Sequence, residues 1–597
     1  MNFISYTRDD VLNALKEHKG SIAYTDIDKA RILSNPNLTK LLDGLKAHAK
    51  EFAEMPILSL SFHNFKRYEE DGNRGAHEKE YFAHRGMLET FALIAWLYED
   101  EEYLHKLEDA IWAICDEYSW AIAAHMRGTS LTEYQEPNPN VDLFAAETAQ
   151  AFAEILSLLE EKLHPTVVMR MRKRLEERIF GQLHQPFAWK EVKICNWAAV
   201  CAGSVGMAAM YEIKDEERLA DILMICLTSI DRFIGGYTED GVCTEGIAYW
   251  GYGFGYFMAF ADMLRRRTGG RLNLFAIEKV HLMATFIGKV LFPHGRSLSF
   301  SDGGSRSVAD PSNTSFLKTI YSDMPIPSEQ SLLFKYPTDT NYRFALALRK
   351  FVHMQAEPFI PTEGLETTYI FPAAQWYVST ADNDISIAAK AGHNSEAHNQ
   401  NDVGSFQIFK NGQQILADLG AGVYDKFYFS EIRYSIFCAG SQGHNVPIIN
   451  GETQKCGRKY AAENVLIDKN GMSYDFQAAY DVETLEKLHR DLRFDNKTGE
   501  VHIEDTYRFT EIPTSVTERY VTEFEPKLGD GVVTIAPENA EMSLYYDKST
   551  WSVSVYVEHK SRGGANYECI SYCIDFSPIE PKKAMKFVLD IRSAREL

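Results

Sequence analysis

The sequence predicts an α+β protein of more than one domain, with an α-helical domain over residues 1–355 and an antiparallel β-sandwich domain over residues 356–597. Three observations lead to this fold class. The 597 residues are too many for a single hydrophobic core. Apolar residues recur at helical spacing in the first part, whereas alternating apolar and polar residues separated by turn signals dominate the second part.

The helical part is recognised by apolar residues that step by three and four positions. One such face comprises Leu104, Leu107, Ile111, Ile114 and Tyr118, and another comprises Phe144, Thr148, Phe152, Ile155, Leu159 and Leu163. Asp142 suits the N-cap of the second helix, and Pro165 lies just beyond it. Further helices are expected near residues 80–98, 168–180, 196–211, 216–234, 252–267 and 276–291. So many successive helices without strands between them indicate helix pairs wound into an arc or toroid.

The pattern changes after a linker-like segment at residues 357–364, which is rich in Pro and Gly. Strands are expected at residues 385–391, 403–410 and 413–418, and the segments 501–507 and 552–557 alternate cleanly. Asn411-Gly412 and Asn470-Gly471 are hairpin signals, and residues 496–499 give a further turn. Many strands joined by short turns predict stacked antiparallel sheets. A cleft between two such domains is a usual place for a ligand.

The charge and cysteine content exclude several classes of protein. The formal net charge of −22 and pI near 5.3 make the chain a poor general binder of nucleic acid or of an anionic membrane. It has no apolar stretch of the length a membrane span needs, and its first ten residues lack the pattern of a secretory signal. The 9 cysteines are scattered, as expected for reduced thiols. We therefore expect a cytoplasmic protein, although a chain whose signal had been removed would look the same.

The densest polar motif is His398-Asn399-Gln400-Asn401-Asp402, directly before the hairpin signalled by Asn411-Gly412. Both turn positions of that hairpin need positive φ, which Asn and Gly tolerate. Polar side chains gathered beside a regular hairpin favour groups that point off a sheet edge at a ligand. The alternative is a polar loop whose groups satisfy one another.

Two motifs in the helical part could face the same ligand. In the first, Asn196 and Trp197 open a segment of small residues, so an amide and an indole could face a pocket; an Asn cap beside a buried Trp is the alternative. The second runs from residue 240 to 253 as a glycine-rich aromatic loop that contains Glu245, Tyr249, Trp250 and Tyr252. Its glycines allow close backbone approach to a ligand, and its rings could stack on sugar or donate protons. A tight turn packed with aromatic rings is the alternative.

Two further groups lie in the β part. Arg433 is a candidate clamp for a carboxylate, because a guanidinium binds carboxylate in a bidentate fork. Gln400, Asp418 and His444 are spread out in sequence but could converge on neighbouring strands and ligate a divalent ion. As a spacing signal alone, that set is weak.

Taken together, these motifs resemble the heparinase II/III-like polysaccharide lyases. Asn196-Trp197, the loop from Glu245 to Trp250, the segment His398 to Asp402, and His444-Asn445 occur in the order seen in that family. The segment from Asp142 to Glu147 also looks like the family, and the resemblance extends from about residue 75 to the C-terminus. It implies an incomplete (α/α) toroid followed by an antiparallel β-sandwich, and an enzyme that cleaves glycosaminoglycan- or alginate-type chains containing uronic acid by β-elimination.

The resemblance also implies the roles of three residues. Asn196 would neutralise the uronate carboxylate, with help from Asn399 or His398, and Tyr249 and His398 would share the roles of base and acid. Neutralisation stabilises the enolate-like intermediate as an oxyanion hole does. A Tyr hydroxyl suits the acid, and it suits the base only where a positive charge lowers its pKa.

Some members of the family hold a structural zinc ion at places that correspond to Gln400, Asp418 and His444. Because Gln offers a hard oxygen ligand, zinc is less strongly favoured and calcium or manganese more so, with a metal-free site as a further alternative. The expected partner is an acidic oligosaccharide or polysaccharide, with no nucleic acid or membrane. The oligomeric state is left open, with a homodimer as one alternative.

Two alternative functions are consistent with some of these residues. A glycoside hydrolase needs two carboxylates across the cleft, and Glu245 and Asp302 are the best candidates. A non-catalytic glycan-binding protein would tolerate loss of Tyr249 and His398. For an intracellular lyase we expect imported oligosaccharides, cut from one chain end in a pocket closed at one side. Residues of the helical part that could form that wall are His84, Arg85, Trp120 and His125.

Overall fold

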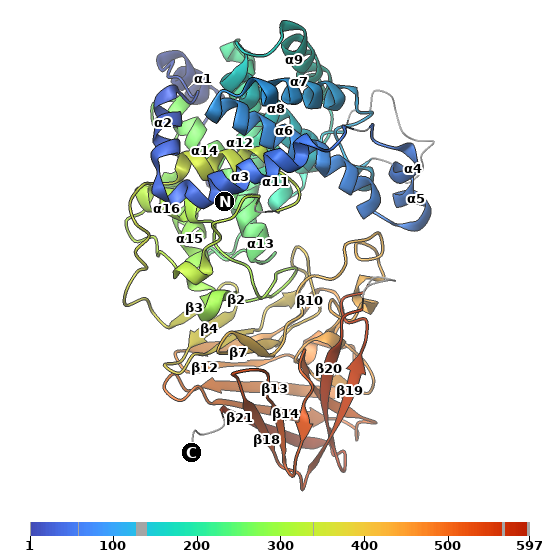
Figure 1. Ribbon diagram of the computed structural model, residues 1–597. Coiled ribbons are helices and arrows are strands. Elements are labelled where there is room, and N and C mark those ends of the chain that lie inside the picture. Colours follow the sequence, from blue (N-terminus) through green and yellow to red (C-terminus); the bar gives the residue numbers. More distant parts are fainter. Residues whose placement is uncertain (1, 58, 127–139, 338, 564–567, 594–597) are drawn as a thin grey trace.

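The protein consists of a helical toroid followed by a β-sandwich domain, as predicted (Figure 1). The computed structural model describes residues 2–57, 59–126, 140–337, 339–563 and 568–593. Within these ranges, no helix is both long and apolar enough to span a membrane. The last helix ends at His353 and the five-stranded sheet begins at Thr368, so the proposed domain boundary between residues 355 and 356 falls in the connecting segment.

The longer helices of the toroid are α1 (Arg8–Glu17), α2 (Asp26–Ser34), α3 (Thr39–Ala53), α6 (Gly75–Tyr98), α7 (Glu101–Asp116), α8 (Leu143–Leu159), α9 (Pro165–Arg178), α11 (Asn196–Glu212), α12 (Glu216–Gly236), α14 (Gly255–Arg267), α15 (Glu278–Thr285), α16 (Pro311–Ile320) and α17 (Phe344–His353). Asp142 caps α8, since its side chain accepts a hydrogen bond from the Ala145 N–H at 2.7 Å. The helix expected over residues 276–291 is shorter, because α15 gives way to a 3₁₀ turn and the short strand β1 (Leu291–Phe292).

Helix α11 lies at the centre of the toroid, packed against α8, α12 and α14. Its small residues allow this close packing. A Cβ on Gly206 would meet the Phe260 ring at 2.4 Å, and one on Gly203 would meet the Tyr256 carbonyl oxygen at 3.1 Å. The N-terminus of α11, which carries Asn196, is thereby fixed by the core of the toroid.

The segment expected as a glycine-rich loop is helical from Ile247 onward. A short helix α13 (Ile247–Tyr249) leads into a π-helical turn η5 (Trp250–Phe254) and then α14. A Cβ on Gly253 would lie 3.1 Å from the Asn196 Cβ, so this glycine lets η5 approach the start of α11. Irregular π turns of this kind are frequent at functional sites.

Three antiparallel sheets form most of the β domain. The five-stranded sheet is β3 (Thr368–Phe371), β4 (Trp376–Thr380), β5 (Ile385–Lys390), β7 (Phe406–Lys410) and β8 (Gln413–Leu416). The eight-stranded sheet is β11 (Glu463–Asp468), β12 (Gly471–Asp475), β13 (Leu485–Phe494), β14 (Val501–Phe509), β21 (Ala584–Ser593), β18 (Met542–Tyr546), β17 (Val532–Ile535) and β16 (Lys527–Leu528). The four-stranded sheet is β19 (Trp551–Glu558), β20 (Ser571–Pro578), β15 (Val516–Thr522) and β9 (Ile448–Ile449). Short pairs join β10 (Gly457–Ala461) to β6 (His393–Asn394) and β1 to β2 (Arg296–Ser297).

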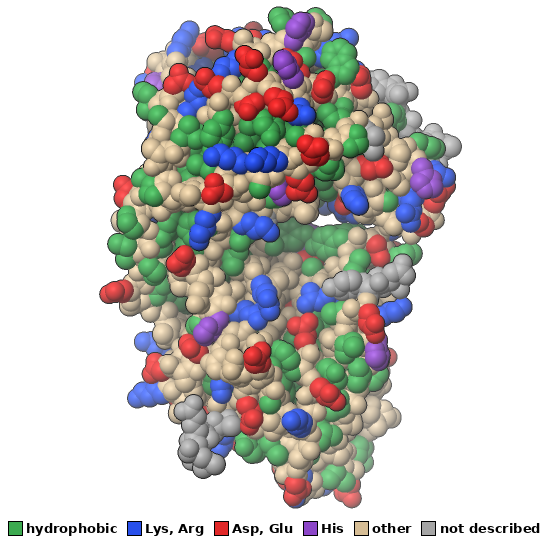
Figure 2. Space-filling model, viewed as in Figure 1, with side chains coloured by type: hydrophobic (Ala, Val, Ile, Leu, Met, Phe, Trp, Pro, Cys, Tyr) green, Lys and Arg blue, Asp and Glu red, His purple; other side chains and the backbone are tan. Residues whose placement is uncertain are grey.

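The five-stranded sheet joins the two halves because both of its faces are buried. Side chains of Trp376, Val378 and Phe409 pack into the toroid core, whereas Tyr377 and Ile408 pack into the core of the β domain. Alternate residues of a strand point to opposite faces, so one sheet serves two cores. This shared layer fixes the toroid against the β domain, with the surface hollowed between them (Figure 2).

The turns on either side of β7 determine the position of the polar motif from His398 to Asp402. Asn411 and Gly412 have φ of 46° and 75°, which confirms the expected turn between β7 and β8. Strand β7 begins at Phe406, later than expected, because residues 402–405 form a turn in which Gly404 has φ of 89°. The motif from His398 to Asp402 therefore lies on the loop between β6 and β7.

Candidate active site

Tyr249 and His398 face each other across the junction of the two halves. Their rings stack with centroids 4.1 Å apart and planes 24° from parallel. Tyr249 comes from the end of α13 in the toroid, and His398 comes from the loop before β7 in the β domain. Both line a cavity of about 1020 Å³ together with Asn196. That volume is typical of a ligand site of the larger kind.

Asp302 holds the imidazole of His398 in place. His398 Nδ1–H donates to Asp302 Oδ2 at 2.8 Å, which leaves Nε2 as the ring nitrogen free of that bond. The backbone of His398 has φ of 55°, an unusual conformation for a non-glycine residue. Arg433 stabilises it by donating to the His398 carbonyl at 3.2 Å and to Asp302 Oδ1 at 2.9 Å. The loop is thus held in a strained shape that points the imidazole into the cavity.

The carboxylate of Asp302 remains charged although it is buried. Burial acts to raise its pKa, but the hydrogen bond from His398 and the charge of Arg433 lower it below the usual value. Tyr424 and Tyr428 also donate to this carboxylate, at 2.9 and 2.6 Å. A fixed anion beside Nδ1 is the arrangement that stabilises an imidazolium when Nε2 takes up a proton.

Tyr249 is protonated at neutral pH. Its hydroxyl lies 2.7 Å from the Tyr424 hydroxyl, and because Tyr424 donates its own proton to Asp302, Tyr249 is the donor of this bond. Burial and the negative charge of Asp302 raise the pKa of Tyr249 above its ordinary value. A neutral phenol at this place suits a general acid.

Asn196 presents its side-chain amide to the cavity. It is the first residue of α11, and its backbone N–H donates to Glu245 Oε1 at 3.1 Å. The side-chain oxygen is buried and has no hydrogen-bond partner among the residues described here. A buried amide oxygen without a partner is costly, so a ligand group that donates a hydrogen bond to it, such as a sugar hydroxyl, would be bound favourably.

Four of the expected substrate-binding residues line the cavity: His125, Trp197, Trp250 and Tyr252. The rings of His125 and Trp197 lie 4.9 Å apart, and His125 Nδ1 pairs with Asp142 at 2.8 Å. Trp250 is buried and donates its indole N–H to the Met283 carbonyl. Tyr252 donates to Glu147 at 2.6 Å. Of these four residues, His125 and Trp197 are therefore the two best placed to contact a sugar.

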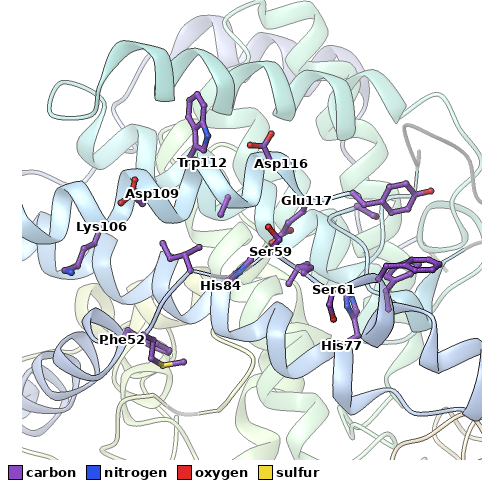
Figure 3. A pocket seen from close by; sticks show the side chains of 18 of the residues that line it. Phe52, Ser59, Ser61, His77, His84, Lys106, Asp109, Trp112, Asp116 and Glu117 are labelled. Carbon is purple, nitrogen blue, oxygen red and sulfur yellow. Dashed lines mark hydrogen bonds and ion pairs between the residues drawn. The ribbon is translucent and has the colours of Figure 1, made fainter.

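His84, Arg85 and Trp120 were also expected to form the wall, but they do not line this cavity. The prediction for these three residues is therefore corrected. His84 and Arg85 both pair with buried Glu117, Arg85 through two bonds at 2.7 and 2.8 Å. His84 faces a separate cavity of about 960 Å³ beside α7 (Figure 3). Trp120 is buried and donates its indole N–H to the Ile114 carbonyl at 3.0 Å. These side chains hold α6 and α7 together, because a buried guanidinium requires a carboxylate partner.

Arg433, Asn399 and Glu245 are also absent from the lining of the cavity that Tyr249 and His398 share. Arg433 clamps Asp302 rather than being free for a substrate carboxylate, since its other donors reach backbone carbonyls. The Asn399 amide donates to the hydroxyl of Tyr434 at 3.3 Å. Glu245 lines a neighbouring cavity, with its Oε2 atom 3.7 Å from His398 Nε2. These residues therefore surround the cavity without lining it.

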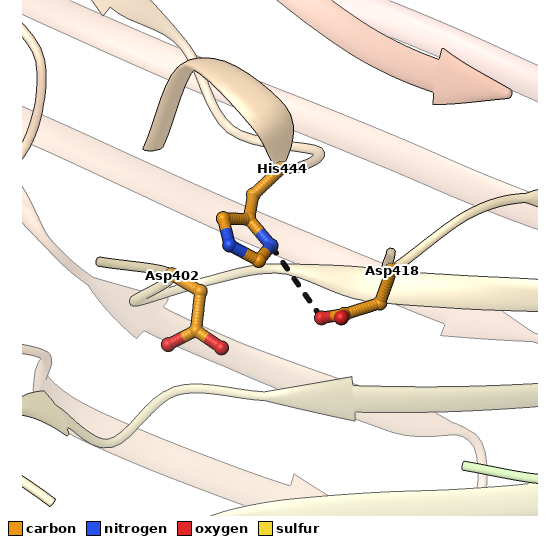
Figure 4. Close-up of side chains that lie close together, drawn as sticks. All are labelled: Asp402, Asp418 and His444. Carbon is orange, nitrogen blue, oxygen red and sulfur yellow. Dashed lines mark ion pairs between the residues drawn. The ribbon is translucent and has the colours of Figure 1, made fainter. Parts of the chain in front are cut away.

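The candidate metal ligands in the structure differ from the predicted set by one residue. Asp402, Asp418 and His444 converge, with ligand atoms within 4.8 Å of one another (Figure 4). Gln400 instead donates to the Gly420 carbonyl at 3.0 Å and to Asp302 at 3.3 Å. Two ion pairs are present, His444 Nδ1 with Asp418 Oδ2 at 3.4 Å and Asp402 Oδ1 with Lys390 at 2.8 Å. Within the described chain, both His444 ring nitrogens and one oxygen of each aspartate are buried without a hydrogen bond, and such atoms fit a divalent cation.

Sequence reasoning missed the residues that organise the site. Asp302 was considered only as a hydrolase carboxylate, and Tyr424 and Tyr428 were not considered at all. The Asp302-Gly303-Gly304 signal was visible, because a Gly-Gly pair marks a turn. Tyr424 and Tyr428 carry no comparable signal. Two cations that line the cavity, Lys193 and Arg306, form no side-chain ion pair within the described ranges.

Comparison with known proteins bears out the fold. Neither a family model nor a curated protein matches the sequence. Among solved structures, heparinase III matches with a TM-score of 0.61 and 14% identity over 94% of this chain and 92% of that chain. Heparan sulfate lyase HepC from Pedobacter heparinus matches with 0.58 and 13% over 98% and 93%. A mutant of the chondroitin AC lyase from Streptomyces coelicolor A3 matches with 0.50 and 10% over 99% and 83%. The protein has the toroid and β-sandwich fold of the heparinase III-like polysaccharide lyases.

Proposed function

We propose that the protein is a polysaccharide lyase that cleaves glycans containing uronic acid by β-elimination. The observation that carries this proposal is the stacking of Tyr249 on His398 in one cavity that Asn196 also lines. The solved lyases of the same fold support the reaction class, because their names include heparan sulfate, heparin and chondroitin lyases. An acidic glycan of the glycosaminoglycan or alginate type is the substrate class that we favour.

The reaction needs one group to remove a proton and another to supply one. In the proposed step, His398 Nε2 takes the proton from the carbon next to the uronate carboxylate. The electron pair of that C–H bond forms a double bond to the neighbouring carbon, and the glycosidic C–O bond of that neighbour breaks. Tyr249 then donates its proton to the departing oxygen. No water is consumed, and the new chain end carries an unsaturated uronate.

The structure favours this division of roles between the two residues. Because Asp302 accepts the Nδ1–H of His398, Nε2 is the ring nitrogen that can accept a proton. The raised pKa of Tyr249 keeps the phenol protonated until the leaving oxygen develops charge. Asn196 would donate its amide to the uronate carboxylate and so stabilise the enolate-like intermediate. The positive end of α11 lies at the same place and contributes in the same direction.

We further propose a structural divalent ion held by Asp402, Asp418 and His444. Zinc is favoured over calcium or manganese by the imidazole and by the small number of ligands. When bound, such an ion would cross-link the loop before β7 to the segment after β8. That segment includes Gly420, whose carbonyl accepts from Gln400, and Gln400 in turn contacts Asp302. The ion would therefore act through the position of Asp302, without contact with the substrate.

A glycoside hydrolase using Glu245 and Asp302 is a weaker alternative. The two carboxylates lie at opposite nitrogens of one imidazole, Asp302 Oδ2 at 2.8 Å from Nδ1 and Glu245 Oε2 at 3.7 Å from Nε2. His398 thus occupies the space between them, where a hydrolase places the sugar. Asp302 is also fully buried and hydrogen-bonded, so it is unsuited to attack a sugar.

The test is a panel of heparan, chondroitin, hyaluronan, alginate and ulvan oligosaccharides, followed by the near-ultraviolet absorbance of the unsaturated product. We expect at least one to be cleaved, and we expect Tyr249→Phe to slow cleavage by about 10²–10⁴-fold. Tyr545→Phe, at an exposed tyrosine of the β domain, is the matched control and should keep full activity. Hydrolysis without absorbance, or full activity of Tyr249→Phe, would overturn the proposal.

A further inference from the structure

A second cavity, of about 570 Å³, adjoins the catalytic cavity at the junction of the two halves. Cys195 and Ala397 line both cavities. The walls of the second cavity come from the end of α12 and the residues after it, from the loop at residues 243–245, and from the β-domain segments 373–375, 392–397 and 458–462. Its volume is within the usual range of sites for small ligands.

Glu245 connects this cavity to the catalytic groups. Its carboxylate accepts from the Asn196 backbone at 3.1 Å and lies 3.7 Å from His398 Nε2, while the side chain lines the second cavity. The residue is only 6% exposed, and its Oε2 atom has no hydrogen-bond partner in the part of the chain that is described. A buried acceptor of this kind lacks a donor, which a sugar hydroxyl would supply.

Arg458 gives the second cavity an unpaired positive charge. It is exposed on β10 and forms no ion pair or side-chain hydrogen bond within the described residues. Two of the carboxylates that line the cavity are already paired, Glu396 with Lys390 at 3.4 Å and Glu239 with Lys279 at 3.2 Å. Burial and the charge of Arg458 lower the pKa of His393 to about 4, so His393 is neutral at pH 7. A free guanidinium in a cleft of an otherwise acidic protein is suited to bind an anion.

We propose that the glycan continues from the catalytic cavity into this second cavity, where Arg458 pairs with an acidic substituent of a sugar next to the one that is cleaved. Glu245 would accept a hydrogen bond from a hydroxyl of the same glycan, at the point where the glycan passes Tyr249 and His398. The inference rests on the proposed lyase function. A glycan that occupies both cavities would extend to both sides of Tyr249 and His398, and the enzyme would then cut it internally. This differs from the expectation of cleavage from one chain end.

The test compares Arg458→Gln with Arg592→Gln, which changes an exposed arginine on β21 outside both cavities. The substrate is the glycan cleaved in the panel, supplied as oligosaccharides of increasing length. We expect the wild-type kcat/KM to rise with length. Arg458→Gln should lower it by about 10-fold on long chains, mainly through KM, and leave the shortest cleaved chain unaffected. Arg592→Gln should match the wild type at every length.

Equal kcat/KM for Arg458→Gln and wild type at all lengths would overturn the inference while leaving the lyase proposal intact. Absence of unsaturated product from every substrate would contradict the lyase proposal itself. In that case calorimetric titration with the same oligosaccharides still tests the cavity: binding weakened about 10-fold by Arg458→Gln supports it, and unchanged binding refutes it. Sulfated and unsulfated chains in parallel distinguish a sulfate from a carboxylate as the group that Arg458 binds.

Discussion

Replacing Asp302 by Asn tests how the structure makes a base of His398. The Asp302 carboxylate accepts from two groups on Oδ2, His398 and Tyr424, and from three on Oδ1, including Arg433. An amide keeps only one oxygen acceptor. Because Arg433 cannot lose its proton, the amide oxygen should remain on that side, and the NH₂ group should then face His398 Nδ1. The imidazole must respond by carrying its proton on Nε2, where it can no longer accept one.

The size of the effect follows from this change of tautomer. In Ser-His-Asp enzymes, the same substitution beside a catalytic histidine costs about 10⁴-fold in kcat through the same tautomer change. We expect a loss of about 10³–10⁴-fold here, which corresponds to about 4–5.5 kcal/mol of activation free energy. The substitution also leaves buried Arg433 without its carboxylate, so the variant should be less stable, by up to about 3–5 kcal/mol.

The assay is the initial rate of unsaturated product, measured beside the thermal unfolding of each variant. Tyr428→Phe is the matched control, because it removes one donor from Oδ1 of Asp302 and leaves the bond to His398 in place. It should cost about 1 kcal/mol of stability and less than 10-fold in rate. A folded Asp302→Asn variant with more than a tenth of the wild-type kcat would show that Asp302 does not make a base of His398.

Three further predictions follow from the same site. Asn196→Ala should lower kcat by about 10²–10³-fold with little change in melting temperature, and a change confined to KM would contradict its role in stabilising the intermediate. A chelator should lower the melting temperature of the wild type but not that of His444→Ala; equal shifts in both would argue against the proposed ion site. Because the pKa of Asp302 is lowered below 3.8 in the folded protein, its charge stabilises the fold above that pH and the stabilisation is lost as the pH falls toward the lowered pKa. The stability difference between wild type and Asp302→Asn should therefore shrink on acidification, and a difference independent of pH would contradict it.

The order and type of the elements could be predicted from the sequence because local patterns determine them. The three- and four-residue spacing of apolar side chains placed α7 and α8, and the Asn411-Gly412 pair placed the turn between β7 and β8. The π turn η5 could not be predicted, because it depends on the approach of Gly253 to Asn196 from a different helix. Local glycine content suggested a loop, whereas tertiary packing made that segment helical.

In the candidate site, too, residues in local motifs could be predicted from the sequence, whereas contacts between distant segments could not. Asn196, Tyr249 and His398 were expected together, and the structure brings all of them to one cavity. The partners of these groups depend on long-range geometry. Arg433 suggested a clamp for substrate, but its buried partner Asp302 lies far away in sequence, and only the fold brings the two to 2.9 Å.

The structure has Asp402 in place of the predicted metal ligand Gln400 for a related reason. The two residues are two positions apart on an irregular loop, so sequence spacing could not decide which side chain points toward Asp418 and His444. In the structure Gln400 turns to Asp302 and the Gly420 carbonyl, which leaves Asp402 beside the other two ligands.

The proposed reaction requires that a phenol from the toroid and an imidazole from the β domain act together on a single uronate. A crystal structure of the Tyr249→Phe variant with an uncleaved acidic oligosaccharide tests this requirement. We expect the uronate carboxylate to lie on the Asn196 amide and the neighbouring C–H bond to point at His398 Nε2. A glycan bound outside the cavity shared by residues 196, 249 and 398, or with its carboxylate turned away from Asn196, would contradict it.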